Sequence, residues 1–168
     1  MNIEEIRDKQ RALDEMIHWK YGLTEQDTIE SRITALSVEV AEMANEAKFF
    51  KYWSLTTINR AKLLEECVDV LHFAASIANT YKLHVRFYPH IEGDENDIHT
   101  SYLSMQQACT VMLDRVNQPN QGGIDQPFDI FMRFFSDFLY LARIEPSEVM
   151  DMYQYKNRIN HKRQQDGY

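Results

Sequence analysis

The stretch Asp27–Phe49, DTIESRITALSVEVAEMANEAKF, is the part of the chain that most clearly determines the fold. Its apolar residues recur at intervals of three and four, which is the period of an α-helix with one buried face. The resulting stripe consists of Ile29, Ile33, Leu36, Val40, Met43 and Ala47. This pattern predicts a helix over 27–49 that packs against other helices.

The same helical period recurs along the rest of the chain, whereas the alternation typical of strands is scarce. Further helices are predicted over about 2–20, 58–81, 97–117, 126–143 and 146–164. Gly22 is suited to a left-handed cap after the first of them. The stretch 84–96, which contains Pro89 and Gly93, is predicted to be an exposed loop. About six helices with mostly short connections predict an all-α fold, an antiparallel bundle with a four-helix core.

Length and charge limit the possible functions. A chain of 168 residues with 44% apolar residues is expected to form one globular domain, 1–168. The formal net charge of −8 argues against binding nucleic acid, because a grip on its phosphates needs a basic face. The chain opens with charged residues and has no apolar run of membrane-spanning length. We therefore expect a cytoplasmic protein that does not bind membranes.

Two acidic pairs with the same spacing stand out on the second and third predicted helices. They are Glu39-Val40-Ala41-Glu42 and Glu66-Cys67-Val68-Asp69. Residues three apart share one face of a helix, so each pair directs two carboxylates the same way. Because both pairs border apolar stripes of helices joined by a short connection, we expect the four carboxylates to converge between two antiparallel helices.

Such a cluster is costly without a counter-charge, because like charges repel and carboxylates beside an apolar seam lose hydration. Divalent cations remove this cost, and Mg²⁺ in particular binds carboxylate oxygens and bridges phosphate oxygens. A bound metal ion can also activate a water molecule and hold a leaving pyrophosphate. The pairs therefore indicate a metal site for phosphate chemistry, with two solvated acidic faces as the alternative.

Two other classes of protein fit parts of the pattern. A di-iron carboxylate bundle uses Glu-x-x-His pairs, and the chain contains Glu15-Met16-Ile17-His18 and Asp69-Val70-Leu71-His72. The second of these has Asp in place of Glu, and iron would leave the basic C-terminal block without a role. A helical adaptor for a basic partner agrees with the negative charge, and it would show neither metal dependence nor turnover.

Three blocks of sequence resemble the all-α dimeric dUTPase family, a relative of the MazG-type nucleoside triphosphate pyrophosphohydrolases. They are Glu39–Glu46 followed by Phe50-Lys51-Tyr52-Trp53, then Leu64–Phe73, and finally Lys156–Tyr168. The acidic pairs are common to the superfamily, whereas the Phe-Lys-Tyr-Trp, Leu-His-Phe and C-terminal blocks are specific to the dUTPase branch. The resemblance covers residues 10–168 in outline and is weakest over 84–128.

The resemblance implies a dUTP diphosphatase, which splits dUTP into dUMP and pyrophosphate through a Mg²⁺-activated water. Two or three Mg²⁺ ions would be bound by Glu39, Glu42, Glu66 and Asp69, and Glu39 would also be the general base. The residues implied as phosphate contacts are Lys51, Lys156, Asn160 and Arg163. The residues implied as contacts of uracil and deoxyribose are Gln10, Trp53, His72 and Phe73, of which Gln10 would read the uracil edge.

Some points are left open by these residues. Some relatives carry an amide where this chain has Asp14, so Asp14 is not among the predicted site residues. The resemblance implies a homodimer, but no apolar patch in the sequence identifies its interface. A broader dNTP or dCTP pyrophosphohydrolase of the MazG type is the alternative function, because the acidic residues do not distinguish bases. Whether dUDP is also a substrate stays open.

Overall fold

In the computed structural model, which describes residues 2–91 and 96–166, six α-helices make up most of the chain. They are α1 (Ile3–Tyr21), α2 (Glu25–Ala47), α3 (Arg60–Tyr81), α4 (Ile98–Asn117), α5 (Asp125–Leu141) and α6 (Pro146–Asp166), and a 3-10 helix η1 (Pro119–Gln121) follows α4. None of the described residues is in a strand. The predicted all-α fold is confirmed, and the helix bounds lie within two residues of those expected.

Local side chains explain where the first helices begin and end. The Thr24 hydroxyl caps the start of α2 by accepting from the backbone N–H of Asp27. In return, the Asp27 carboxylate accepts from the backbone N–H of Thr24 at 2.9 Å. This reciprocal arrangement satisfies N–H groups that the helix itself leaves unpaired. Gly22 ends α1 with a φ of 65°, so the predicted left-handed cap is confirmed.

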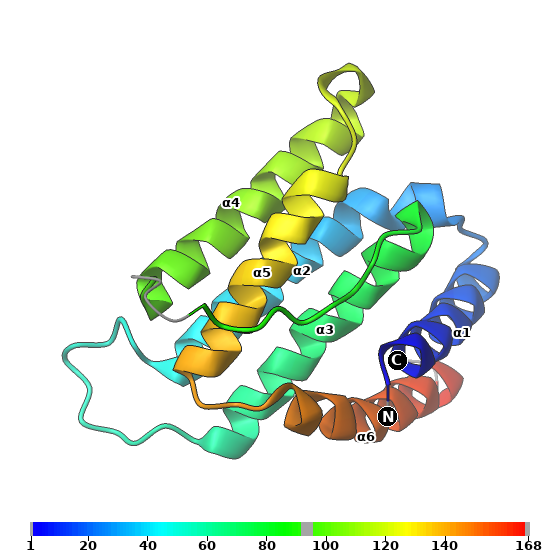
Figure 1. The fold of residues 1–168 in the computed structure, drawn as a ribbon. Helices are drawn as coiled ribbons and strands as arrows, with labels where there is room; N and C mark the ends of the chain where they lie inside the picture. Colours follow the sequence, from blue (N-terminus) through cyan, green and yellow to red (C-terminus); the bar gives the residue numbers. More distant parts are fainter. Residues whose placement is uncertain (1, 92–95, 167–168) are drawn as a thin grey trace.

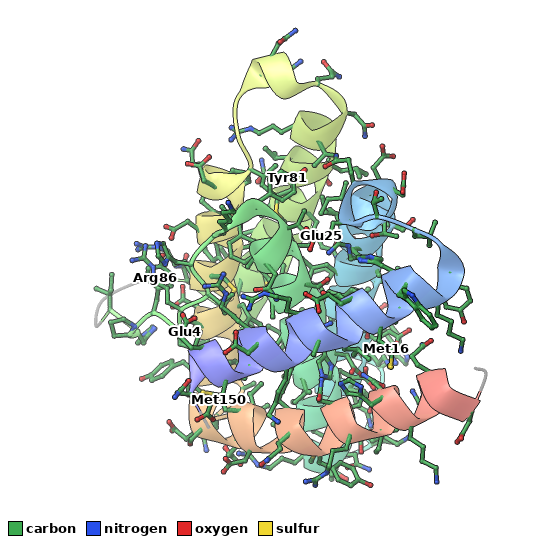
Figure 2. The ribbon with its side chains drawn as sticks, turned by 90° about the vertical axis from the view of Figure 1, so that its right-hand side faces the viewer. Glu4, Met16, Glu25, Tyr81, Arg86 and Met150 are labelled. Carbon is green, nitrogen blue, oxygen red and sulfur yellow. The ribbon has the colours of Figure 1, made fainter. Side chains whose placement is uncertain are left out.

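The helices are arranged around the central pair α2 and α3 (Figure 1). α4 packs against α2, and α5 packs against α4, which places both on one side of the pair. α1 and α6 pack against α3 on the other side and also against each other. Figure 2 shows α1 and α6 side by side, with Glu4 and Met150 near the same end, so these two helices run in the same direction.

The core follows the predicted stripes. All six apolar residues of the α2 stripe are buried, and so are four of the five phenylalanines of α5, Phe128, Phe131, Phe135 and Phe138. Both cysteines are free and buried, as small apolar side chains would be. No helix in the described ranges has the length and apolar character that crossing a membrane would need.

The stretch 84–96 differs in part from the expected exposed loop. Residues 84–91 have no regular secondary structure, but Val85 is buried and the Phe87 ring lies 6.2 Å from the ring of Phe135. The Ser136 hydroxyl accepts from the backbone N–H of Tyr88 at 2.9 Å. Apolar side chains at alternate positions therefore attach this segment to α5. The remaining residues of the stretch up to 95, Gly93 among them, lie outside the described residues.

Candidate active site

Three of the four predicted metal ligands come together between α2 and α3. Glu39 and Glu42 lie on α2, and Glu66 lies opposite them on α3, with one carboxylate oxygen of each within 4.8 Å of the others. The two helices run in opposite directions on either side of the connection 48–59 (Figure 1). The i, i+3 spacing then brings acidic side chains of both helices to the same level of the seam.

The fourth, Asp69, is paired with other groups. Its Oδ2 is in close contact with the ammonium group of Lys156 on α6, and its Oδ1 lies 3.3 Å from His72 Nδ1. Burial favours the neutral form of Asp69, but His72 and Lys156 outweigh it and keep the pKa of this carboxyl below its usual value. The Asp69 carboxylate is therefore negative, and Lys156 is its counter-charge.

Glu39 has a strongly perturbed carboxyl group. Partial burial and the negative charges of Asp69, Glu42 and Glu66 raise the pKa of Glu39 to about 7. The pKa of Glu66 is also raised, first by burial and then by Asp69. Lys156 offsets only part of this repulsion. The negative charge of the cluster is thus only partly compensated by Lys156.

A cavity of about 430 Å³ adjoins the cluster at Asp69 and extends between α1, α2, α3 and α6. Its walls include five residues that the resemblance implied as substrate contacts, Gln10, His72, Phe73, Asn160 and Arg163. Asn160 and Arg163 come from α6, and the others come from α1 and α3. Asp69 thus contributes a carboxylate to the cavity wall, and Arg163 contributes a cation on the α6 side.

Two of the implied substrate contacts lie elsewhere. Lys51 and Trp53 belong to the connection 48–59 and do not line the cavity. The indole of Trp53 is 64% exposed and its ring contacts are with Phe50 and Tyr52, at 6.2 Å and 5.0 Å. Lys51 Nζ lies 5.7 Å from the centre of the Phe50 ring. A role for either residue at the nucleotide stays a prediction.

Three buried polar residues of the cavity wall, Asp14, Arg32 and Ser76, are not among the predicted site residues. All three are at most 9% exposed. Arg32 could have been found, because it lies three residues after Ile29 and four before Leu36, within the apolar stripe of α2. A charged residue on a buried face usually has specific partners.

Convergent carboxylates beside a cavity that Arg32 and Arg163 line fit an all-helical enzyme that acts on phosphorylated compounds. Comparison with protein families gives the substrate: the family model described as dUTPase matches residues 2–168. The chain belongs to this family, the all-α dUTPases, and the reaction of the family is the hydrolysis of dUTP. Searches of the curated proteins and of the solved structures found no match.

Proposed function

We propose that this dUTPase acts through divalent metal ions, preferably Mg²⁺, that are bound by Glu39, Glu42 and Glu66. The single observation that carries the proposal is the convergence of these three carboxylates, whose ligand oxygens lie within 4.8 Å of one another. Oxygen donors alone suit Mg²⁺ rather than softer metals. The raised pKa of Glu39, which reaches about 7, reflects the same need for positive charge.

Asp69 is the fourth ligand in this proposal once Lys156 leaves it. It lies three residues after Glu66 on α3 and therefore on the same face of that helix. The resemblance implies two or three metal ions. When bound, they neutralise the carboxylates and the phosphates and make a water molecule more acidic.

The side chains of the protein then transfer the proton and bind the substrate. Glu39 takes the proton of the attacking water as the general base, the role that the resemblance implies. Lys156, Asn160 and Arg163 are spaced four and three residues apart on α6, so they share one face of that helix. We infer that this face binds the triphosphate, and that Phe73 forms a wall for the base and sugar further inside the cavity.

We also infer a homodimer, as the resemblance implies. The connection 48–59 supports an interaction of this kind, because several of its large apolar side chains are exposed, namely Phe50, Tyr52, Trp53, Leu55 and Ile58. Lys51 and Trp53 would reach a nucleotide if this connection moved toward the cavity or belonged to a second copy. Sedimentation over a range of concentrations tests the dimer.

The decisive experiment is a pyrophosphate-release assay with a panel of deoxynucleoside triphosphates, with and without Mg²⁺. We expect dUTP to be hydrolysed only with metal. Glu39→Gln should lower kcat by at least about a hundredfold while the helical circular dichroism spectrum is unchanged, because a general base contributes roughly 10²–10⁴-fold. Turnover of dUTP in a chelator would overturn the metal mechanism, and equal turnover of all nucleotides would favour the broader MazG-type activity.

A further inference from the structure

Tyr153 of α6 has no part in the reaction described above, although it is fully buried where α6 packs on both α1 and α3. Its hydroxyl donates to Gln10 Oε1 at 2.8 Å and lies 3.3 Å from the backbone oxygen of Ile6, and both of these residues belong to α1. The hydroxyl therefore fixes the phenol ring from the α1 side. A buried ring that is held in this way is a rigid surface for the side chains packed on it.

The side chain packed on this ring is the imidazole of His72, which belongs to α3. The centres of the two rings are 4.3 Å apart, and their planes are inclined by 49°. His72 is only 5% exposed, and its Nε2 is buried without a hydrogen-bond partner among the described residues. The orientation of the imidazole therefore depends on its packing, to which Tyr153 contributes, and on the contact that Nδ1 makes.

The contact of His72 Nδ1 is with the predicted metal ligand Asp69, whose Oδ1 lies 3.3 Å away. A carboxylate can only accept, so the proton of this hydrogen bond is on Nδ1. A half-turn of the imidazole would replace this N–H by a C–H and end the hydrogen bond.

The two carboxylate oxygens of Asp69 have different partners. His72 holds Oδ1, whereas Oδ2 contacts the ammonium group of Lys156. Oδ2 is therefore the oxygen that becomes available to another cation once Lys156 leaves. The hydrogen bond from His72 does not depend on Lys156, so it can keep the carboxylate oriented while one cation replaces the other.

We propose that Tyr153 is a positioning residue for the metal ligand Asp69, and that it acts through His72. The inference rests on the proposed function, in which Asp69 binds a metal ion, and it adds a second role for His72 to the substrate contact that the resemblance implies. Groups that hydrogen-bond to a metal-binding side chain contribute roughly 10–100-fold to metal affinity. α6 thus affects the metal site in two opposite ways, because Lys156 competes with the ion whereas Tyr153 prepares Asp69 to bind it.

The test is the affinity for Mg²⁺, measured by calorimetry without nucleotide so that contacts to the substrate do not enter. Tyr153→Leu removes the aromatic ring and should weaken Mg²⁺ binding by at least about fivefold, and His72→Leu should weaken it by at least about tenfold. His72→Asn should restore most of the loss. The amide nitrogen of asparagine is bonded to Cγ, as Nδ1 is in histidine, so it can donate to Asp69 from nearly the same place.

A purely structural role of Tyr153 predicts the opposite sign. If Tyr153→Leu only loosened α6, Lys156 would leave Asp69 more easily and Mg²⁺ would bind more tightly. The double variant gives a second distinction, because Tyr153→Leu should cause no further loss of affinity once His72→Leu has removed the link. Tighter or unchanged binding in Tyr153→Leu, or an equal loss with and without His72, would overturn the inference.

Tyr155→Leu is the matched control. Tyr155 lies on the same helix, is 54% exposed and does not line the cavity, so Mg²⁺ affinity should stay within about twofold. Where Tyr153→Leu does not fold, Tyr153→Met takes its place, because a flexible side chain fills the space left by the ring more easily. If neither variant folds, unchanged Mg²⁺ binding in His72→Leu overturns the inference by itself. An unmodified protein that binds no Mg²⁺ would instead contradict the proposed function.

Discussion

At the scale of single residues, Glu39 shows why the carboxylates of the site favour binding of a metal ion. Its carboxyl group is half-buried and close to three other acids, so ionisation is opposed by both lost hydration and repulsion. The folded protein without metal therefore holds the Glu39 proton more tightly than the unfolded chain does. This difference makes the stability of the metal-free protein depend on pH.

The sign of this dependence can be tested with Glu39→Gln in the presence of a chelator. The pKa of Glu39 is raised from 4.5 to about 7, so its contribution to stability is complete below pH 4.5 and is lost as the pH rises through 7. Glutamine does not ionise, so the variant does not lose stability at this position as the pH rises. The melting temperature of the variant should rise relative to that of the unmodified protein between pH 5 and 8, by a few degrees in all.

Glu15→Gln is the control for this experiment, because Glu15 is an exposed acid of α1 away from the cluster. Its effect on the melting temperature should not change over the same pH range. If Glu39→Gln behaves in the same way as Glu15→Gln, the carboxylates are not crowded in the metal-free protein.

Lys156 occupies the position of a counter-ion. Its ammonium group contacts Asp69, and only 16% of its side chain is exposed, so the pair is well shielded from water. A metal ion that binds Asp69 has to displace this cation. Lys156→Met should therefore tighten Mg²⁺ binding in the absence of nucleotide, by at least about threefold, which corresponds to under 1 kcal/mol.

The same variant should be less active on dUTP, because the displaced ammonium group is then missing at the triphosphate. Isothermal titration with Mg²⁺ and steady-state kinetics measure the two effects. Lys162→Met is a suitable control, since Lys162 is exposed on the same helix. Weaker Mg²⁺ binding in Lys156→Met would show that Lys156 does not compete with the metal.

At the scale of helices, the sequence was sufficient to place the seam between α2 and α3. The apolar stripe of α2 and the acidic spacing depend only on helical periodicity, which is a local property. The positions of Arg32 and Asp14 in the cavity wall depend on contacts between three helices. Periodicity does not reveal which polar side chains will meet there. Lys156 was expected to contact a phosphate group of the substrate. Its contact with Asp69 follows from the packing of α6 on α3, which is a tertiary feature.

α6 provides a prediction at this scale. Tyr153 and Asn157 attach its first part to the rest of the protein through buried side chains, whereas Asn160 and Arg163 line the cavity. A protein truncated after Ile159 should therefore fold and still bind Mg²⁺. Its affinity for a non-hydrolysable dUTP analogue should fall by at least about tenfold, because charge-assisted contacts to phosphate are lost.

Affinity for deoxyuridine should change much less in the truncated protein, and calorimetry with both ligands measures the difference. Arg158→Met is the control, because Arg158 is exposed and does not line the cavity. Full activity of the truncated protein would show that the end of α6 is only a surface helix.

At the scale of the whole molecule, the site is built by one side of the bundle. α1, α2, α3 and α6 surround the cavity, while α4 and α5 pack on the far side of α2 (Figure 1). The connection 48–59 emerges at the end of α2 and α3, and its exposed aromatic side chains include one of the two tryptophans of the chain. Movement of this connection would be visible in tryptophan fluorescence.

Trp19→Phe leaves Trp53 as the single tryptophan. Both indoles are well exposed, at 86% and 64%, so each should emit at the long wavelength typical of contact with water. If Trp53 becomes a wall of the nucleotide pocket, as the resemblance implies, a dUTP analogue with Mg²⁺ should shift its emission to shorter wavelength. Trp53→Phe, in which only Trp19 reports, should show no shift, because Trp19 does not line the cavity.

The dependence on protein concentration then separates the two ways in which Trp53 can be covered. A shift that appears with ligand at every concentration indicates that the connection closes over the nucleotide of its own chain or of a stable dimer. A shift that follows concentration without ligand indicates that Trp53 is covered by association of two copies. Long-wavelength emission under all these conditions would mean that Trp53 stays in water, and that the base is held by the cavity walls of α1, α2 and α3 alone.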